Sequence, residues 1–365
     1  MGTGPLTLAD RGLATGTYDE LVTPTEIPFE SGTWTSEWTP VPFAFDELVA
    51  SWNADTPRGT WIRVEMQARG SGRETKLYTL MTWAATDSDI HRTSLQGQKD
   101  DDGDVDIDTF IRSRSARPLD AYRLRLTLYR RAGLGVSPSV RLVAAMASAS
   151  FRFAIPSAFD GRAMDLDVPT YSQEIHKGEF PQYDDGGENW CSPTSTAMVV
   201  AYHRVGPSPD DLAAFPGSGY ADPQVDHAAR YTYDWNYKGA GNWPANVAYA
   251  SRFGLDGFVT RLRSLSEAQL FIEAGIPLVA SINGTLPGFL TGTTNGHLLV
   301  IRGFDAGGNV ITNDPAVRSD REARKVYRRA DFERVWLGGS AGIVYVIYPK
   351  GKTLPANVAG LPPNW

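Results

Sequence analysis

The sequence of 365 residues predicts two domains, an all-β sandwich followed by an α+β domain. Three observations lead to this prediction. The chain is long for a single hydrophobic core. Strand-like stretches separated by turn clusters fill the part before residue 155. Helical patterns followed by strand-like runs fill the part after it, which is an α+β order. We therefore expect domains over residues 1–155 and 156–365.

The strands of the first domain are predicted from alternation. Residues 60–68 and 122–130 alternate apolar and polar side chains, as half-buried strands do. Clusters of Gly, Pro, Ser and Asp at residues 68–75, 99–106 and 132–139 indicate turns. Many short strands without helices between them are typical of an antiparallel sandwich, here expected to be jelly-roll-like. Residues 153–169 contain two prolines and a glycine and are expected to form a linker.

The second domain begins with helices and ends with strands. Helical spacing of apolar residues predicts helices over residues 191–206, 208–215, 243–254 and 264–275. Ser266, which precedes Glu267, is a plausible cap of the last of these helices. Apolar runs predict strands over residues 276–282, 296–304 and 341–349.

Composition excludes several classes of function. The net charge is −7 and the two signs are interspersed, which argues against a nucleic-acid partner. The single cysteine excludes an intrachain disulfide and cysteine-based zinc sites, and the five histidines show no ligand spacing, so we expect no metal and no cofactor. No apolar run is long enough to span a membrane. No signal peptide is visible, yet the appended sandwich favours a secreted or cell-surface protein over a cytoplasmic one.

The only cysteine, Cys191, is expected to open a helix. It stands just ahead of Pro193, and proline favours the first turn of a helix. At that position the helix dipole favours a thiolate and would lower the pKa of the thiol. A cysteine that only packs would more naturally lie inside the helix, on its apolar stripe with Met198 and Ala201. The position therefore indicates a nucleophile.

A thiolate nucleophile needs a base, and His297 is the best placed histidine because it begins a predicted buried strand. His91 falls in the first domain. His203 lies about three turns along the helix of the cysteine and cannot reach it. His176 and His227 occupy polar stretches and are expected to be solvated. His176 is nevertheless a reserve candidate, because it is close to the cysteine in sequence.

The base needs an orienting partner. Residues 305–309 read as a hairpin turn that brings Asn313 and Asp314 back beside His297. Strand side chains alternate, so an even loop would place Asp314 on the histidine face and an odd loop would place Asn313 there. Either side chain could accept a hydrogen bond from Nδ1 of the ring. Asp314 could instead be a plain turn residue before Pro315.

Four motifs together resemble a known family. They are VPTYSQ (residues 168–173), NWCSPTSTAMVV (189–200), GHLLVIRGF (296–304) and ITNDPA (311–316). In this order they resemble the papain-like cysteine peptidases of the bacteriocin-processing type, family thirty-nine in the usual classification. The resemblance covers residues 168–349 and implies a papain-like fold there. The sequence departs from it at Ser192, where relatives often have glycine. Relatives linked to transporters also have membrane spans and a nucleotide-binding domain, so cleavage of double-glycine leaders is not implied.

The resemblance implies a role for four residues. Cys191 would be the nucleophile, His297 the base, and Asp314 rather than Asn313 the orienting residue. Gln173 would donate a hydrogen bond to the oxyanion, a role that calls for an N–H donor. The alternative for Gln173 is a solvated loop side chain.

Substrate contacts are expected beside the nucleophile and in an aromatic loop. Trp190 and Ser192 flank Cys191, and Trp243 ends the Gly-rich aromatic segment of residues 231–244. We expect this segment to form a wall of the cleft, with a packed surface loop as the alternative. The substrate would be a peptide or protein.

Two features of the first domain suggest ligands, although simpler interpretations exist. Its tryptophans could stack on a carbohydrate or a cell-surface ligand, but core packing explains most of them better. These are Trp34, Trp38, Trp52, Trp61 and Trp83. Asp104, Asp106 and Asp108, in the acidic stretch Asp100–Asp108, share a predicted strand face and could bind calcium. A solvated acidic hairpin is favoured, because the stretch lacks the glutamate and glycine placement of an EF-hand loop.

The sequence thus predicts a thiol-dependent hydrolase, a cysteine peptidase that cleaves amide bonds through a thioester on Cys191. One alternative is an acyl or peptidyl transferase on the same site. The other is a non-catalytic binding protein that uses its β-sandwich.

Overall fold

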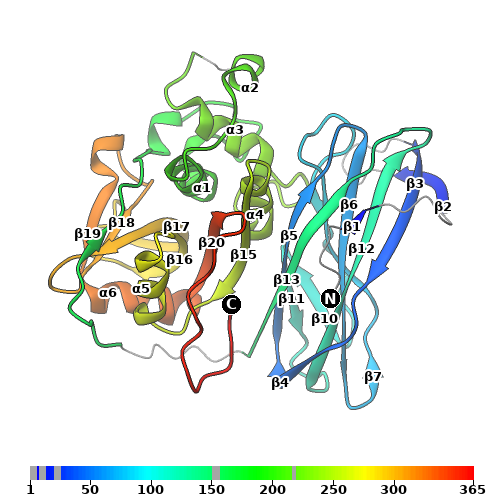
Figure 1. Cartoon of the computed structure of the whole chain (residues 1–365), viewed down its shortest axis with the longest axis horizontal. Coiled ribbons are helices and arrows are strands. Elements are labelled where there is room, and N and C mark those ends of the chain that lie inside the picture. The colour runs from blue at the N-terminus through cyan, green and yellow to red at the C-terminus, as the bar shows by residue number, and fades with distance from the viewer. Residues whose placement is uncertain (1–5, 8–13, 20–25, 150–156, 216–218) are drawn as a thin grey trace. The chain divides into compact units, whose positions relative to one another are not determined.

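The computed structural model describes residues 6–7, 14–19, 26–149, 157–215 and 219–365, which form three β-sheets (Figure 1). Contacts divide the chain into two units. The first comprises Met1–Ser150 and Tyr233–Ala248, and the second comprises Phe151–Thr232 and Tyr249–Trp365. The boundary expected between residues 155 and 156 lies within residues 150–156, which are outside the described residues, so it stays a prediction. The expected linker also lies partly outside them.

The described part of the first unit contains two antiparallel sheets (Figure 1). One sheet has the strand order β1 (Leu6–Thr7), β13 (Ser139–Ser148), β5 (Glu47–Asp55), β11 (Thr109–Arg112) and β10 (Gly103–Asp106). The other has the order β2 (Ala14–Asp19), β3 (Glu26–Thr35), β12 (Leu119–Arg131), β6 (Thr60–Gly70), β8 (Tyr78–Trp83) and β9 (Thr93–Ser94). In this second sheet β4 (Thr39–Phe45) pairs with β12, and β7 (Arg73–Glu74) pairs with β6.

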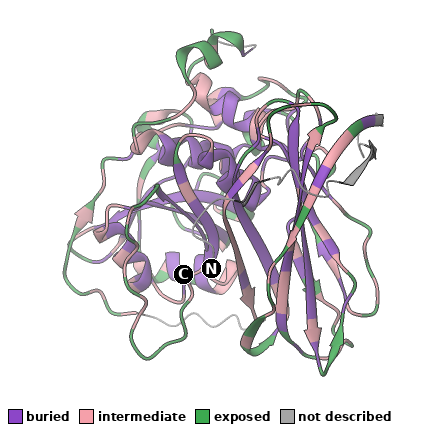
Figure 2. Ribbon diagram, turned by 45° about the vertical axis from the view of Figure 1, so that its right-hand side comes forward, coloured by how far each residue is buried: buried purple, intermediate pink, exposed green. Residues whose placement is uncertain are grey.

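Aromatic side chains fill the space between these two sheets. Trp52 of β5 packs edge-on against Trp83 of β8, with ring centroids 6.3 Å apart. Tyr78 of β8 meets Phe110 of β11 at 4.8 Å. Figure 2 shows buried stretches along the strands of this unit, and Trp52, Trp61 and Trp83 are each at most 1% exposed. Core packing therefore accounts for these three tryptophans. Carbohydrate binding by this unit stays a prediction, as does its jelly-roll order.

The acidic stretch forms the hairpin of β10 and β11. Asp108 lies in the turn after β10 and does not share the strand face with Asp104 and Asp106, contrary to expectation. Asp100 accepts hydrogen bonds from the Tyr78 hydroxyl and from two backbone N–H groups. Asp102 pairs with Arg117 at 2.5 Å. These carboxylates find partners inside the protein, which supports the hairpin interpretation, and calcium binding is untested.

The second unit has one antiparallel sheet with helices around it. Its strand order is β15 (Leu255–Arg261), β20 (Ile343–Pro349), β16 (Leu278–Thr285), β17 (Thr293–Phe304), β18 (Val310–Asn313) and β19 (Arg324–Tyr327), and β14 (Met164–Asp165) pairs with β17. The helices are α1 (Cys191–Tyr202), α2 (Pro209–Ala214), α3 (Pro223–Thr232), α5 (Leu265–Glu273) and α6 (Arg329–Glu333). A further helix, α4 (Trp243–Ser251), spans the border between the units. Single turns are η1 (Glu174–His176), η2 (Gly187–Asn189), η3 (Asp320–Glu322) and the π-helical η4 (Arg334–Gly338).

Helix α1 is fixed to this sheet by two serines. Ser195 donates a hydrogen bond to the carbonyl of Leu298 in β17, at 3.1 Å. The Ser192 hydroxyl lies 2.9 Å from the hydroxyl of Tyr345 in β20, and both are buried. The four helices expected in this half of the chain are present, with ends that differ by a few residues. The cap expected at Ser266 is wrong, because Ser264 accepts the hydrogen bond from the backbone of Glu267 at the start of α5.

Candidate active site

A buried histidine and a buried aspartate meet at the junction of β17 and β18. The side chain of His297 is 5% exposed, and its Nε2 donates a hydrogen bond to Oδ1 of Asp314 at 2.8 Å. The expectation that Nδ1 makes this bond is wrong, because Nε2 makes it. Since Nε2 faces the carboxylate, Nδ1 is the ring nitrogen left for another group. The histidine partner is Asp314 and not Asn313.

Asp314 is itself held from two other directions. The hydroxyl of Tyr327, in β19, donates to Oδ2 at 2.6 Å. The backbone N–H of Ala316 donates to Oδ1 at 3.0 Å. Burial, reinforced by the charge of Asp314, raises the pKa of Tyr327, which keeps the phenol protonated as a donor. Tyr327 was not predicted as a site residue, because nothing in the residues around it distinguishes it from any strand tyrosine.

Cys191 is the first residue of α1 and interacts with the same imidazole. Burial by itself would lower the pKa of His297. The charge of Asp314, the hydrogen bond to Asp314 and a hydrogen bond to Cys191 outweigh burial and raise this pKa to about 10. The ring is therefore an imidazolium near neutral pH. A protonated ring beside the thiol can act as a general acid towards a leaving group. Phe289 covers one side of this ring, with centroids 4.9 Å apart.

The Asn-Asp-Pro segment ties three parts of the site together. Asn313 donates to the carbonyls of Val168 and Pro169, at 3.0 and 2.9 Å. The carbonyl of Pro315 accepts the backbone N–H of Gln173 at 2.9 Å. Asp314, which lies between Asn313 and Pro315, accepts the hydrogen bond from His297. Asn313, weighed above only as an orienting residue, thus anchors the extended segment that leads to Gln173.

Gln173 is buried beside the segment that precedes the cysteine. It is 3% exposed, and its Nε2 donates to the carbonyl of Glu188 at 2.6 Å. This close approach requires a glycine at Gly187, where an added Cβ would lie only 2.2 Å from the carbonyl oxygen of Gln173. An amide nitrogen has two N–H groups, so the bond to Glu188 uses one of them. Gln173 is therefore not a solvated side chain.

The three residues expected to contact substrate have contacts within the protein. Trp190 and Ser192 are fully buried. The indole of Trp190 donates to the carbonyl of Tyr183 at 2.6 Å, and the hydroxyl of Ser192 binds Tyr345. Their positions indicate packing roles and do not support direct contact with substrate. Trp243 belongs to the first unit, where its backbone N–H donates to Asp108 at 2.7 Å, so its predicted place in a cleft wall stays a prediction.

Two histidines expected to be solvated are buried. His176 is 0% exposed and His227 is 2% exposed. His227 lies 2.9 Å from the hydroxyl of Tyr249, and its aromatic neighbours explain its burial. His176, the reserve candidate for the base, contacts Glu179 instead of the cysteine. The structure thus brings Cys191 together with His297.

Comparison with known families agrees with the four motifs. Residues 2–148 match the family model described as the Peptidase C39 N-terminal domain, and residues 165–341 match that of the Peptidase C39-like family. No curated protein matches the chain. Among the described residues, no helix has the length and apolar character needed to cross a membrane. The two matched models follow one another along most of the sequence, and the protein belongs to the C39-like cysteine peptidases that have this N-terminal domain.

Proposed function

We propose that the protein hydrolyses amide bonds of peptides or proteins, with Cys191 as nucleophile, His297 as the acid and base, and Asp314 as the orienting residue. One observation supports this more than any other. A single buried imidazole donates to a carboxylate that accepts two further hydrogen bonds, and it also interacts with the only thiol of the chain. A thiol, an imidazole and a carboxylate in series are what covalent acyl transfer requires.

In the first step the Cys191 thiolate attacks the carbonyl carbon, and a carbon–sulfur bond forms. The negative charge moves to the carbonyl oxygen. The His297 imidazolium then gives its proton to the amide nitrogen, the carbon–nitrogen bond breaks, and the amine leaves. Asp314 keeps the ring in place and stabilises its charged form.

In the second step a water molecule gives a proton to His297 as its oxygen attacks the thioester. The carbon–sulfur bond breaks, the acid product leaves, and the thiolate–imidazolium pair is restored. The oxyanion in both steps would accept hydrogen bonds from the side-chain amide of Gln173 and from the backbone N–H of Cys191. The first N–H groups of a helix lack an acceptor within the helix, so that of Cys191 is suited to this role.

We also propose a papain-like arrangement for residues 156–365 and a sandwich-type accessory domain for residues 1–155. A helix that begins with the nucleophile and packs on an antiparallel sheet supports the first part. Two antiparallel sheets with aromatic contacts between them support the second. The secreted or cell-surface location and the lack of a nucleic-acid partner stay predictions.

A mixed peptide library tests the proposed activity. The wild type should cleave a subset of the peptides, and the Cys191→Ala variant should cleave none while its melting temperature stays close to that of the wild type. Cleavage retained by this variant would exclude a thioester. An added amine nucleophile separates hydrolase from transferase, because a transferase would yield the amide of that amine as the main product.

A further inference from the structure

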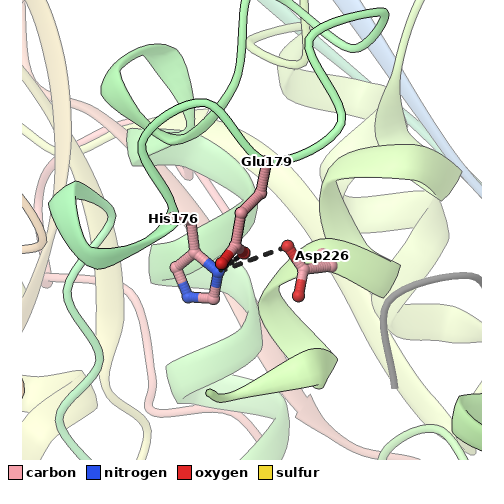
Figure 3. Close-up of side chains that lie close together, drawn as sticks. All are labelled: His176, Glu179 and Asp226. Carbon is pink, nitrogen blue, oxygen red and sulfur yellow. Dashed lines mark hydrogen bonds and ion pairs between the residues drawn. The ribbon is translucent and has the colours of Figure 1, made fainter. Parts of the chain in front are cut away.

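A second histidine of the same unit lies among carboxylates, away from the thiol. His176 ends η1, Glu179 follows in the next loop, and Asp226 lies in the first turn of α3. Nδ1 of His176 lies 2.8 Å from Oε2 of Glu179 and 3.2 Å from Oδ1 of Asp226. Figure 3 shows both carboxylates directed at this one nitrogen. One ligand atom from each residue lies within 4.8 Å of the others.

Hydrogen bonds within the protein do not satisfy this cluster. The side chains of His176 and Asp226 are 0% exposed, and that of Glu179 is 17% exposed. Among the described residues, neither oxygen of Asp226 accepts a hydrogen bond of acceptable geometry, although one of them is close to Nδ1. A ring nitrogen has one proton or one lone pair, so Nδ1 cannot serve both carboxylates well. A buried carboxylate that accepts no well-formed hydrogen bond is costly, which indicates that a further group completes the site.

A divalent cation would complete the bonds of the Asp226 carboxylate and would neutralise the charge of the cluster. Two carboxylates near one imidazole leave net negative charge in a buried place, and a doubly charged ion neutralises it. Bonds of about 2.1 Å in a tetrahedral zinc site place neighbouring ligand atoms about 3.4 Å apart. The separations of 2.8 and 3.2 Å from Nδ1 reach that arrangement with small side-chain movements. We infer that His176, Glu179 and Asp226 bind a divalent transition metal ion, with Zn²⁺ as the best match to one imidazole and two carboxylates.

The bound ion would act as a structural clamp. It would join η1 and the loop after it to α3, and α3 packs against α1, the helix that begins with the nucleophile. The backbone N–H of His176 donates to the carbonyl of Gln173 at 3.1 Å, so the clamp lies next to that residue. Metal sites that join segments distant in sequence stabilise the fold by their binding free energy. The inference does not depend on the proposed peptidase activity.

Zn²⁺ binding is measured in the full chain with the Cys191→Ala substitution. This substitution is needed because Cys191 and His297 could themselves bind zinc. The protein is treated with a chelator, dialysed against Zn²⁺ and assayed by elemental analysis and by titration calorimetry. We expect one Zn²⁺ per chain and a higher melting temperature with zinc than without it. In a parallel sample with Co²⁺, the visible d–d bands of a tetrahedral site should appear.

Adding Asp226→Asn should weaken Zn²⁺ binding by at least about 100-fold. Loss of a group that only supports a metal ligand already lowers metal affinity about 10- to 100-fold. The matched control is Asp210→Asn, which removes an exposed carboxylate from α2 and should leave binding unchanged. If the Asp226→Asn protein does not fold by circular dichroism, Glu179→Gln replaces it and should give the same loss.

Two outcomes would overturn the inference. Zinc binding that is equally strong with and without Asp226 would place the ion elsewhere. No binding and no rise in melting temperature in the Cys191→Ala background would mean that the three side chains share protons and hold no metal.

Discussion

Two buried histidines of the second unit each face carboxylates, but their surroundings differ. His297 donates a hydrogen bond to the carboxylate of Asp314, which accepts three hydrogen bonds in total. Near His176 there are two carboxylates, and that of Asp226 accepts none within the described part of the chain. His297 also interacts with a thiol, whereas two carboxylate oxygens lie close to Nδ1 of His176.

The difference shows that residue type alone does not decide what a buried histidine does. A complete set of hydrogen bonds fixes the ring of His297 in one orientation, with Nδ1 directed away from the carboxylate and available for proton transfer. An incomplete set with excess negative charge suits a cation instead. Burial is common to both sites, so the number of partners of each carboxylate is the informative quantity.

Replacement of His297 should give the largest effect. We expect His297→Ala to lower kcat/KM on a cleaved peptide on the order of 10⁴-fold or more, because both proton transfers of the reaction are lost. The matched control is His203→Ala, which removes a half-buried imidazole just beyond the far end of α1 and should change kcat/KM by less than about threefold. Steady-state kinetics at neutral pH measures kcat/KM of both variants and of the wild type. More than a tenth of the activity left in His297→Ala would contradict the role assigned to it.

Replacement of Asp314 should have a smaller effect that depends on pH. The oxygen of Asn can still accept the Nε2–H bond, so we expect Asp314→Asn to lower kcat about 10- to 100-fold. Asp314 raises the pKa of His297, which is about 10, so its loss must lower that pKa. Loss of activity at high pH, where the imidazolium deprotonates, should therefore begin at a lower pH in the variant. An alkaline limb at the same pH in both proteins would speak against the charge of Asp314 acting on the ring.

The sequence predicts those residues of the site whose positions can be read from a short stretch around them. Cys191 stands at a helix start and His297 near a strand start, and both positions are visible in short stretches. The choice between Asn313 and Asp314 needed the family resemblance, because β17 has an irregular register between Ile301 and Gly303 that no sequence pattern reports.

Tyr327 and the His176 cluster could not be predicted, because their contacts join residues far apart in the chain. The polar neighbours of His176 suggested solvent exposure, and only the fold shows that Glu179 and Asp226 lie beside its ring.

In the first unit the position of Asp108 could not be predicted either, because its contact joins residues far apart in the chain. The alternating acidic stretch suggested a strand face, but the chain turns there and the carboxylate accepts the N–H of Trp243.

Removal of the Tyr327 hydroxyl should give a still smaller loss. Tyr327 is a positioning residue that acts through Asp314, so Tyr327→Phe should lower kcat about 3- to 10-fold and leave KM unchanged. Tyr220→Phe removes the hydroxyl of a tyrosine that is 45% exposed and serves as the control. A change in KM alone, with kcat as in the wild type, would show that Tyr327 affects substrate binding rather than the orientation of the carboxylate.

The smallest effect concerns the attachment of α1 to the sheet. Ser192→Ala removes one partner of a buried hydroxyl pair and should lower the free energy of unfolding by about 1 kcal/mol. The double variant with Tyr345→Phe should lose less than the sum of the two single losses, since both changes remove the same contact. Urea unfolding measures all three, and strictly additive losses would mean that the two hydroxyls do not interact.

The central claim is that His297 makes the thiol of Cys191 reactive. It is tested most directly by the rate at which iodoacetamide alkylates this thiol, because the chain has a single cysteine. The native protein at pH 6 should react at least about tenfold faster than the protein unfolded in urea, since Cys191 lies at the start of α1 and interacts with His297. In His297→Ala this advantage should disappear. Slower labelling in the native wild type than in the unfolded chain would show that Cys191 is a buried structural thiol.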